Sequence, residues 1–301
     1  MHPSEEIFCE KSEKLKGKRI VMGITGSIAA VECFSVIREL IRHGADVVPA
    51  LTEAASRLVA EDALEFASGH RPVKELTGRT EHIALMGEAD LLLVFPATAN
   101  TVSKIASGID DTAVTSMATV ALGSGVPIAI APAMHESMYR NPAVSENVDR
   151  LRSWGVEFIG PRTDGVRAKV ASKDEVVEAV IRMLSGGSLS GRKVLVVGGR
   201  SEEAIDSMRI VTNRSSGRMA VAVAAAAYEA GADVELWMGG CDVPLPPFIP
   251  VRRFSSVSEL MSMLPGISHD VVLVPAALAD FAPASKASGK ISSGSGVDLR
   301  L

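Results

Sequence analysis

The chain has 301 residues, of which 47% are hydrophobic and only 4% aromatic, so it is long enough for two domains packed mainly by aliphatic side chains. Its net charge of −5 and its lack of a basic stripe argue against nucleic acid as a partner, and no apolar run approaches the roughly 20 residues of a membrane span. The three cysteines, Cys9, Cys33 and Cys241, have no metal-site spacing, and the polar N-terminus is not a signal peptide, so we expect a cytoplasmic protein that binds small molecules.

Strand-like and helix-like patterns alternate along the first half of the chain. The expected strands are 19–25, 45–52, 90–96, 127–132 and 156–160. The expected helices are 28–42, an alanine-rich stretch after Thr52, 141–154 and 173–184. Strands separated by helices predict an α/β fold with a doubly wound, Rossmann-like parallel sheet and right-handed crossovers.

The stretch 185–191, with the sequence SGGSLSG, predicts a linker. After it the alternation restarts with a strand at 193–197, a long loop, a helix at 215–230, strands at 233–238 and 270–275, and a hairpin-like stretch at 290–301. We therefore predict a first domain at 1–187 and a second Rossmann-like domain at 188–301. Because the last residues have the pattern of a strand in mid-course, we expect the natural chain to continue past Leu301.

The sequence GITGSIAA, residues 23–30, directly follows the first expected strand. Gly26 permits a tight turn, and Ser27 can cap the next helix, whose free N–H groups and dipole attract a phosphate. The pattern is not a full GxGxxG, and a tight turn with an ordinary N-cap would look the same. The segment predicts a phosphate site at Gly26, Ser27 and Ile28, with the structural turn as the alternative.

Two more clusters follow expected strands. PATANT, residues 96–101, places Thr98 and Asn100 at the carboxyl edge of the sheet, where open α/β folds bind ligands. Uncharged polar side chains suit a neutral heterocycle, and the alternative is a helix N-cap served by Asn100 or Thr101. APAMHESM, residues 131–138, is a stiff loop that suits a flat ring and carries His135, which on its own is more typical of a surface residue.

His82 lies in TEHI, residues 80–83, where a polar loop becomes an apolar run before the third strand. Histidine is the commonest general base because its pKa lies near the working pH. A single histidine is still more often structural than catalytic, so the residue type alone leaves both interpretations open.

In order and spacing, these segments resemble the flavin-binding cysteine decarboxylase family, which includes phosphopantothenoylcysteine decarboxylase. GITGSIAA, the histidine of HIAL, PATANTVSKIASGIDD and PAMHESM carry the resemblance, which covers about 18–185. It implies FMN as the cofactor, a catalytic His82, and trimers with FMN at the subunit interface, sometimes four trimers together. The cofactor-binding positions that it implies are Gly26, Ser27, Ile28, Thr52, Thr98, Asn100, Ala131 and Met134.

The chain departs from that family at two positions. His135 stands where the family has an asparagine that contacts the substrate carboxylate, and an imidazole can still donate a hydrogen bond there. The family's substrate flap carries a cysteine that is thought to supply the proton for the final reduction. The equivalent stretch here, 164–171, has no cysteine, so Lys169 is the candidate donor, with a solvated surface lysine as the alternative.

The second half has its own cluster of polar residues. NRSSG, residues 213–217, places an amide, a guanidinium and two hydroxyls before the expected helix, which suits a phosphate or an acyl phosphate. A serine N-cap beside a solvated arginine is the alternative. AALAD, residues 276–280, follows an expected buried strand and brings Asp280 to the sheet edge, and Lys290 comes ten residues later.

NRSSG, AALAD and KI in this order resemble phosphopantothenate–cysteine ligase, and the two halves together resemble the bifunctional coenzyme A biosynthesis family. The resemblance implies that CTP and Mg²⁺ activate 4′-phosphopantothenate for attack by cysteine, and that the phosphopantothenoylcysteine formed is then decarboxylated to 4′-phosphopantetheine. Asn213 would act on the activated acyl group, Asp280 and Lys290 would contact the nucleotide, and the ligase would form a dimer. Later ligase segments do not occur before Leu301, so we expect the ligase part to be incomplete.

Other functions remain open at this point. A peptidyl-cysteine oxidative decarboxylase shares much of the loop set and differs mainly in lacking a fused ligase. A flavin prenyltransferase would need a different glycine–serine turn and no PAM loop. A non-catalytic flavoprotein that regulates a phosphatase would carry an acidic tail, which does not occur in the sequence.

Overall fold

The computed structural model describes residues 2–160, 162–163, 168–292 and 300. The chain divides into two compact units, Met1–Leu184 and Ser185–Leu301, and each has its own parallel sheet. Within the described residues, no helix combines the length and the apolar character that crossing a membrane requires.

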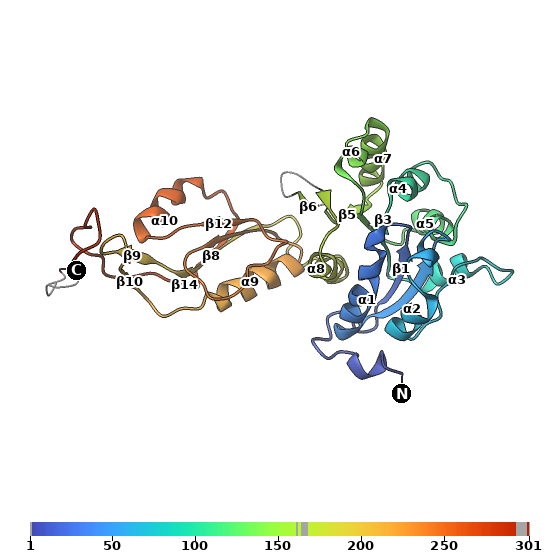
Figure 1. Cartoon of the computed structure of the whole chain (residues 1–301), viewed down its shortest axis with the longest axis horizontal. Coiled ribbons are helices and arrows are strands. Elements are labelled where there is room, and N and C mark those ends of the chain that lie inside the picture. The colour runs from blue at the N-terminus through green and yellow to red at the C-terminus, as the bar shows by residue number, and fades with distance from the viewer. Residues whose placement is uncertain (1, 161, 164–167, 293–299, 301) are drawn as a thin grey trace. The chain divides into compact units, whose positions relative to one another are not determined.

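The first unit is built on a five-stranded sheet in the order β2-β1-β3-β4-β5 (Figure 1). Its strands are β1 (Arg19–Ile24), β2 (Asp46–Leu51), β3 (Leu91–Ala97), β4 (Ile128–Pro132) and β5 (Glu157–Phe158), and neighbouring strands are parallel. The strand order reverses between β1 and β3, and ligands of open α/β sheets bind outside the carboxyl ends of the strands at such a point. The predicted doubly wound sheet is confirmed.

Helices cover both faces of this sheet (Figure 1). One core contains α1 (Cys33–Arg42), α2 (Glu61–Ser68) and α8 (Lys173–Leu184), which pack on strand residues such as Met22 and Leu93. The other contains α3 (Glu81–Glu88), α4 (Ala99–Ala106), α5 (Ala113–Ser124) and α7 (Pro142–Ser153), on residues such as Val21 and Leu92. Alternate residues of each strand therefore pack into opposite cores. The shorter elements are η1 (Glu5–Ile7), η2 (Ile28–Glu32), η3 (Ala55–Arg57), α6 (Glu136–Tyr139), β6 (Arg162–Thr163) and β7 (Ala168–Lys169).

Charged side chains connect the amino ends of β1, β2 and β3, which are neighbours in the sheet. Arg19 bonds to Asp46 through its Nε at 2.7 Å, and its backbone N–H donates to Asp90 at 2.8 Å. Lys18 pairs with Asp90 at 2.8 Å, and His70 bonds to the other oxygen of Asp46. The hydrogen bond from His70 lowers the pKa of the Asp46 carboxyl. This end of the sheet is opposite to the end where ligands are expected.

The structure corrects three element predictions in this unit. Residues 28–32 form the 3-10 helix η2 before α1, because Ser27 accepts the Ala30 N–H three residues later, at 2.8 Å. The residues around His82 form helix α3 instead of a loop. Helix α5 was not predicted. Alanine, methionine and threonine occur on all sides of this helix, so its faces differ little in hydrophobicity and the sequence shows no clear helical period.

The second unit has a parallel sheet in the order β12-β11-β8-β13, and β14 also pairs with β8. Its strands are β8 (Lys193–Arg200), β11 (Asp233–Met238), β12 (Val251–Arg253), β13 (Val271–Leu273) and β14 (Ala276–Ala277). Helix α9 (Arg218–Glu229) packs on one face, and α10 (Val257–Met263) with η4 (Leu264–Gly266) lies on the other. The loop after β8 contains an antiparallel pair, β9 (Glu202–Ala204) and β10 (Ile210–Thr212).

Two expectations for the second unit were wrong. The helix expected from Ser215 begins at Arg218, after Gly217, whose φ of +75° is left-handed and whose added Cβ would lie 2.8 Å from the Cβ of Cys241. The strand expected to be buried is β13, a sheet-edge strand whose three residues are 39–41% exposed. Apolar composition does not reveal whether a strand is covered. Most of the hairpin-like stretch 290–301 lies outside the described residues.

Candidate functional site

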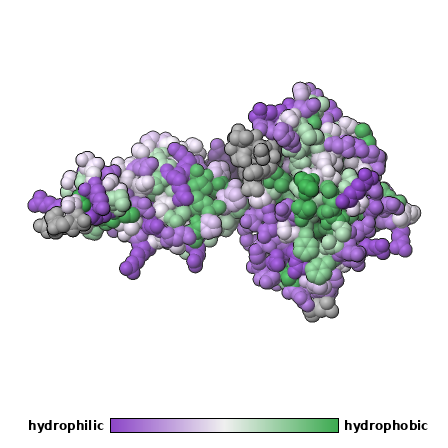
Figure 2. All heavy atoms as spheres, viewed as in Figure 1, coloured by the Kyte–Doolittle hydropathy of each residue, from purple (hydrophilic) through white to green (hydrophobic). Residues whose placement is uncertain are grey.

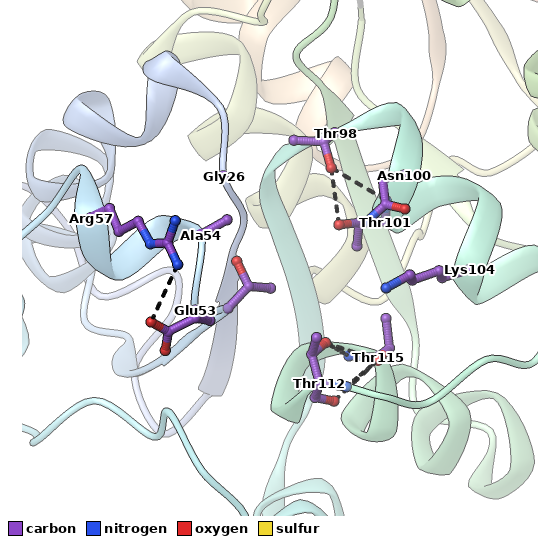
Figure 3. Close-up of a pocket in the computed structure, with 11 residues that line it drawn as sticks. Gly26, Glu53, Ala54, Arg57, Thr98, Asn100, Thr101, Lys104, Thr112 and Thr115 are labelled. Carbon is purple, nitrogen blue, oxygen red and sulfur yellow. Dashed lines mark hydrogen bonds and ion pairs between the residues drawn. The ribbon is translucent and has the colours of Figure 1, made fainter.

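A cavity of about 460 Å³ lies at the carboxyl edge of the first sheet, where β1 and β3 end (Figure 3). Its volume falls within the range of small-molecule sites, and five of its eleven lining residues are threonines, which offer hydroxyl donors and acceptors. The lining consists of Gly26, Thr52, Glu53, Ala54, Arg57, Thr98, Asn100, Thr101, Lys104, Thr112 and Thr115.

Gly26 closes one wall of the cavity against the loop after β2. A Cβ added at Gly26 would lie 2.5 Å from the Cβ of Ala54, so the two backbones approach as closely as they do only because residue 26 has no side chain. Thr52 supports the same loop: its hydroxyl donates to the Ile24 carbonyl at 3.4 Å and accepts from the Ala55 N–H at 3.3 Å.

Ser27 joins the glycine turn to the PAM loop. Its hydroxyl accepts from the Ala29 N–H at 3.4 Å and donates to the Ala133 carbonyl at 3.3 Å, while its own N–H is bonded to Thr25 O. Within the described residues, the N–H groups of Gly26 and Ile28 have no hydrogen-bond partner. These two N–H groups, rather than that of Ser27, are available to an anion, and the Ile28 side chain is 76% exposed.

PATANT is attached to β1 by the hydroxyl of Thr25. That hydroxyl donates to the Pro96 carbonyl at 2.7 Å and accepts the Thr98 N–H at 3.0 Å. Thr98, with an extended backbone, is the N-cap of α4 and accepts from the Thr101 N–H at 3.3 Å. The prediction of Asn100 or Thr101 as the cap was wrong, because both already lie inside the helix. Asn100 is therefore free to face the cavity (Figure 3).

The sequence prediction missed part of the lining. Lys104 lies one helical turn after Asn100 and Thr101, so the i,i+3 and i,i+4 spacing of α4 brings it to the same face. Its Nζ lies 2.6 Å from the Asp111 carboxylate. Thr112 and Thr115 cap each other at the start of α5, with N–H to hydroxyl distances of 3.0 and 3.2 Å. A capping pair in the sequence TAVT was the signal for this helix start. The sequence prediction also missed Glu53, Ala54 and Arg57. Their position directly after β2, at the carboxyl edge of the sheet, was the only sequence feature that could have indicated them.

Four of the eight predicted cofactor positions line the cavity, namely Gly26, Thr52, Thr98 and Asn100. Ala131 is fully buried in β4 as part of a core, and Met134 packs against the other core. Neither they nor Ser27 and Ile28 are lining residues. His135 is exposed and caps α6, with its Nδ1 2.8 Å from Ser137 Oγ. A capping role therefore occupies one imidazole nitrogen of His135.

His82 lies in the first turn of α3 and does not line the cavity of its own chain. Its Nδ1 is buried and has no hydrogen-bond partner among the described residues. Such unpaired buried polar atoms are uncommon and call for an explanation, such as a ligand or a partner chain. The neighbouring Ile83 side chain is 54% exposed.

Lys169 lies in β7, where it pairs with Arg162 of β6 in an antiparallel ladder. Its side chain is outside what the structure describes, so its predicted role as a proton donor remains a prediction.

The second unit contains a pocket of about 550 Å³ around NRSSG. Asn213 donates from its Nδ2 to the Leu278 carbonyl at 2.8 Å, which joins NRSSG to AALAD. Arg200, at the end of β8, bonds to the Ser215 carbonyl at 2.8 Å and to Asp242 Oδ1 at 2.9 Å. The lining consists of Arg200, Thr212, Asn213, Arg214, Ser215, Ser216 and Asp242.

The two predicted nucleotide contacts lie outside this pocket's lining. Asp280, two residues beyond Leu278, and Lys290 are both exposed. Across the described part of the chain, no group of three or more His, Cys, Asp or Glu side chains is arranged to hold a metal ion.

Comparison with known proteins matches both units. Residues 9–185 match the family described as Flavoprotein, and residues 189–301 match the family described as DNA/pantothenate metabolism flavoprotein C-terminal domain. The whole chain is 48% identical to the coenzyme A biosynthesis bifunctional protein CoaBC of Thermococcus kodakarensis and covers 76% of its length. The chain belongs to the CoaBC family. The CoaBC protein of Methanocaldococcus jannaschii is 37% identical over the whole chain, which covers 74% of that protein.

Among solved structures, the FMN-dependent cysteine decarboxylase SpaF is 30% identical, with a TM-score of 0.47. The match covers 54% of this chain and 97% of that chain. The family resemblance predicted from NRSSG, PATANT and their companion motifs is confirmed by the whole-chain matches to CoaBC.

Proposed function

We propose that the chain carries out two consecutive steps of coenzyme A biosynthesis. The second unit joins cysteine to 4′-phosphopantothenate with CTP, and the first decarboxylates the resulting phosphopantothenoylcysteine to 4′-phosphopantetheine with FMN. The observation that carries this proposal is the whole-chain match to CoaBC, in which each unit also has a polar pocket at its predicted motif.

The first cavity fits a flavin mononucleotide. It lies at the β1/β3 reversal, it is large enough for a small ligand, and the unpartnered N–H groups of Gly26 and Ile28 suit a phosphate. Thr52 and Thr98 would hold the phosphate and the ribityl chain, and Asn100 would bond to the ring. Bound FMN supplies the two-electron oxidation of the cysteine thiol, and the resulting C=S group accepts the electrons left by the departing carboxylate.

His82 would move the proton in the decarboxylation step, and its place in α3 suggests how. Since His82 does not line the cavity of its own chain, we propose that His82 of a neighbouring copy completes the site. An apolar surface supports such an association (Figure 2). The elements η2 and α1 carry the exposed apolar residues Ile28, Val31 and Phe34, and the Phe34 ring stacks on that of the exposed Phe66.

We propose that the first unit forms a trimer through this surface, with dimers through the second unit and a dodecamer as the combination of both. Contiguous apolar patches on soluble proteins commonly mark interfaces. Light scattering after gel filtration measures the assembly directly. A Val31→Glu variant should then lose both its assembly and its flavin, because one surface serves both, whereas a monomeric parent protein that retains FMN would contradict the shared site.

In the second unit, Asn213 would act on the activated acyl group, and Asp280 and Lys290 would contact the nucleotide. Arg214 adds positive charge to the pocket, whose other arginine, Arg200, is paired with Asp242, and a guanidinium suits the carboxylate and phosphates of the substrates. Mg²⁺ would accompany CTP and be held mainly by its phosphates, as is usual for this ion.

The final reduction needs a proton at carbon, and we propose Lys169 as its source, with His135 as the alternative. Lys169→Met should still release CO₂ but accumulate an enethiol that absorbs in the near ultraviolet. Formation of phosphopantetheine by that variant at the parent rate would exclude Lys169 and favour His135.

The two activities can be tested separately in one protein. Given 4′-phosphopantothenate, cysteine and CTP with Mg²⁺, the protein should release CO₂ and form 4′-phosphopantetheine. His82→Asn should keep its flavin and stop at phosphopantothenoylcysteine, whereas Lys290→Gln should decarboxylate supplied phosphopantothenoylcysteine but not make it from CTP. If His82→Asn loses flavin together with activity, His82 is structural, and if the parent protein releases no CO₂ from supplied phosphopantothenoylcysteine, the decarboxylase assignment fails.

A further inference from the structure

Asp206 is the most deeply buried carboxylate among the described residues of the second unit, and it has no part in the proposed chemistry. It lies in the turn between β9 and β10, its residue is 3% exposed, and it does not line the pocket around NRSSG. Burying a carboxylate is costly unless hydrogen bonds replace its water, so its donors indicate what it holds in place.

Four hydrogen bonds from described residues converge on this carboxylate. Oδ1 accepts from the backbone N–H groups of Met208 at 2.7 Å and Arg209 at 2.8 Å, which closes the β9–β10 turn. Oδ2 accepts from the Arg209 guanidinium and from the backbone N–H of Ile291 at 3.0 Å. The last donor is 85 residues away in the sequence, so the carboxylate joins two distant segments.

Two more bonds strengthen the same connection. The Arg209 guanidinium also donates to the Ile291 carbonyl at 3.2 Å, and the Ala287 N–H donates to the Ile205 carbonyl at 3.0 Å. Residues 287–291 are therefore held at both ends against the turn around Asp206. Lys290 is the residue directly before Ile291, and its exposed side chain projects from the segment at the point where it is fixed.

We propose that Asp206 is a positioning residue that holds the segment 287–291 so that Lys290 is presented to the nucleotide. This inference rests on the proposed nucleotide contact of Lys290. Holding the segment in advance removes part of the ordering cost that binding would otherwise carry. Asp206 itself touches no substrate in this arrangement.

The matched variant is Asp206→Asn. An asparagine of the same shape has a single acceptor oxygen, and its NH₂ group faces N–H donors that a carboxylate oxygen accepted. With the amide oxygen on the Met208 and Arg209 N–H groups, the Ile291 N–H loses its partner, and the Ile291 end of the segment is held only through the Arg209 guanidinium. Backbone ordering of one or two residues then has to occur on binding, which corresponds to CTP affinity weaker by about 10- to 100-fold.

The test measures the segment and the nucleotide separately in the full-length protein. Hydrogen exchange of the Ile291 amide should accelerate at least tenfold in Asp206→Asn, with a rise in KM for CTP·Mg²⁺, a retained kcat and an unchanged KM for 4′-phosphopantothenate. Arg209→Met, which keeps the Asp206 turn but removes the guanidinium link, should show a smaller change of the same kind. Asp233→Asn, an exposed carboxylate at the start of β11, is the matched control and should change neither quantity.

The outcomes separate this inference from the function on which it rests. If Asp206→Asn leaves the Ile291 amide exchange and the CTP affinity unchanged, or if it impairs both substrates and kcat alike, the positioning role is wrong. If Lys290→Gln binds CTP as tightly as the parent protein, the nucleotide contact itself fails, and the positioning role fails with it. If Asp206→Asn does not fold, the Arg209→Met variant decides by the same two measurements.

Discussion

Replacing Gly26 by alanine should damage the flavin cavity through a single added methyl group. The Cβ of the new side chain would lie 2.5 Å from the Cβ of Ala54 and 3.4 Å from the Ala54 carbonyl carbon. Carbon atoms in contact normally lie about 3.5–4.0 Å apart, so the glycine turn and the loop after β2 must separate by about 1 Å. No rotamer change relieves this overlap, because both atoms are attached directly to the backbone.

Overpacking of this kind typically costs about 1–3 kcal/mol, and here the displaced loop carries Thr52, whose hydroxyl supports the cavity. Gly26→Ala should therefore lower the free energy of unfolding of the first unit by about that amount and reduce its flavin content. Ala54→Gly in the same chain removes the nearest atom and should restore most of the loss, since the remaining contacts at 3.4 and 3.5 Å are near normal.

The assay is the flavin-to-protein absorbance ratio together with urea unfolding of the first unit, followed by the fluorescence of Trp154 in a Trp237→Phe background, since Trp237 lies in the second unit. Gly123→Ala, in helix α5 with no atom within 4 Å of the added Cβ, is the matched control and should stabilise by about 0.5–1 kcal/mol. A Gly26→Ala protein with parental stability and flavin content would refute the close-approach argument. So would a double variant that is no better than Gly26→Ala alone.

Four further predictions follow from particular contacts. Ser27→Asp should release flavin because it places a negative charge beside the phosphate, whereas Ser27→Ala should retain flavin. Visible absorbance measures the bound flavin, and unchanged absorbance in Ser27→Asp would contradict the placement of the phosphate. Thr112→Ala removes a cap of α5 and should cost about 0.5–2 kcal/mol in urea unfolding, and a neutral result would mean that the capping box contributes little. Burial raises the pKa of the Cys33 thiol, so a thiol reagent at about pH 8 should label Cys9 and Cys241 before Cys33. Hydrogen bonds from Met208, Ile291 and Arg209 lower the pKa of Asp206 to about 2, below the usual value of about 3.9. Its stabilisation is therefore complete above roughly pH 4 and is lost as the pH falls toward 2, and a loss of protection of the Ile291 amide, relative to its intrinsic exchange rate, already at about pH 5 would contradict this.

Local patterns predicted the frame of the site well. The run RIVMGI followed by a glycine turn is sufficient for a strand and a helix start, because both depend on neighbouring residues. The parallel sheet then follows from the alternation of strands and helices, and the order of its strands brings Gly26 and Thr98 to the same edge. Half of the predicted cofactor positions line the cavity for this reason.

The other parts of the site depend on packing between distant segments. Lys104 and Thr112 reach the cavity only because α4 and α5 both pack on the same face of the sheet, which no local pattern reports. His82 was expected in a loop, since α3 is a short helix with weak contrast between its faces. The exposure of β13 was missed for a related reason: an apolar strand has the same sequence whether or not another element covers it.

In the first sheet, the charged connections that stabilise the fold and the residues that line the ligand cavity lie at opposite ends of the strands. Lys18, Arg19, Asp46 and Asp90 join the strands at one end, while the ligand cavity occupies the other. A substitution among these four residues should therefore change how firmly the first unit holds together and how it responds to salt, without changing what it binds. An ancestral or engineered chain could adapt to a hotter or saltier environment by revising this end alone, because the chemistry is located a full strand length away.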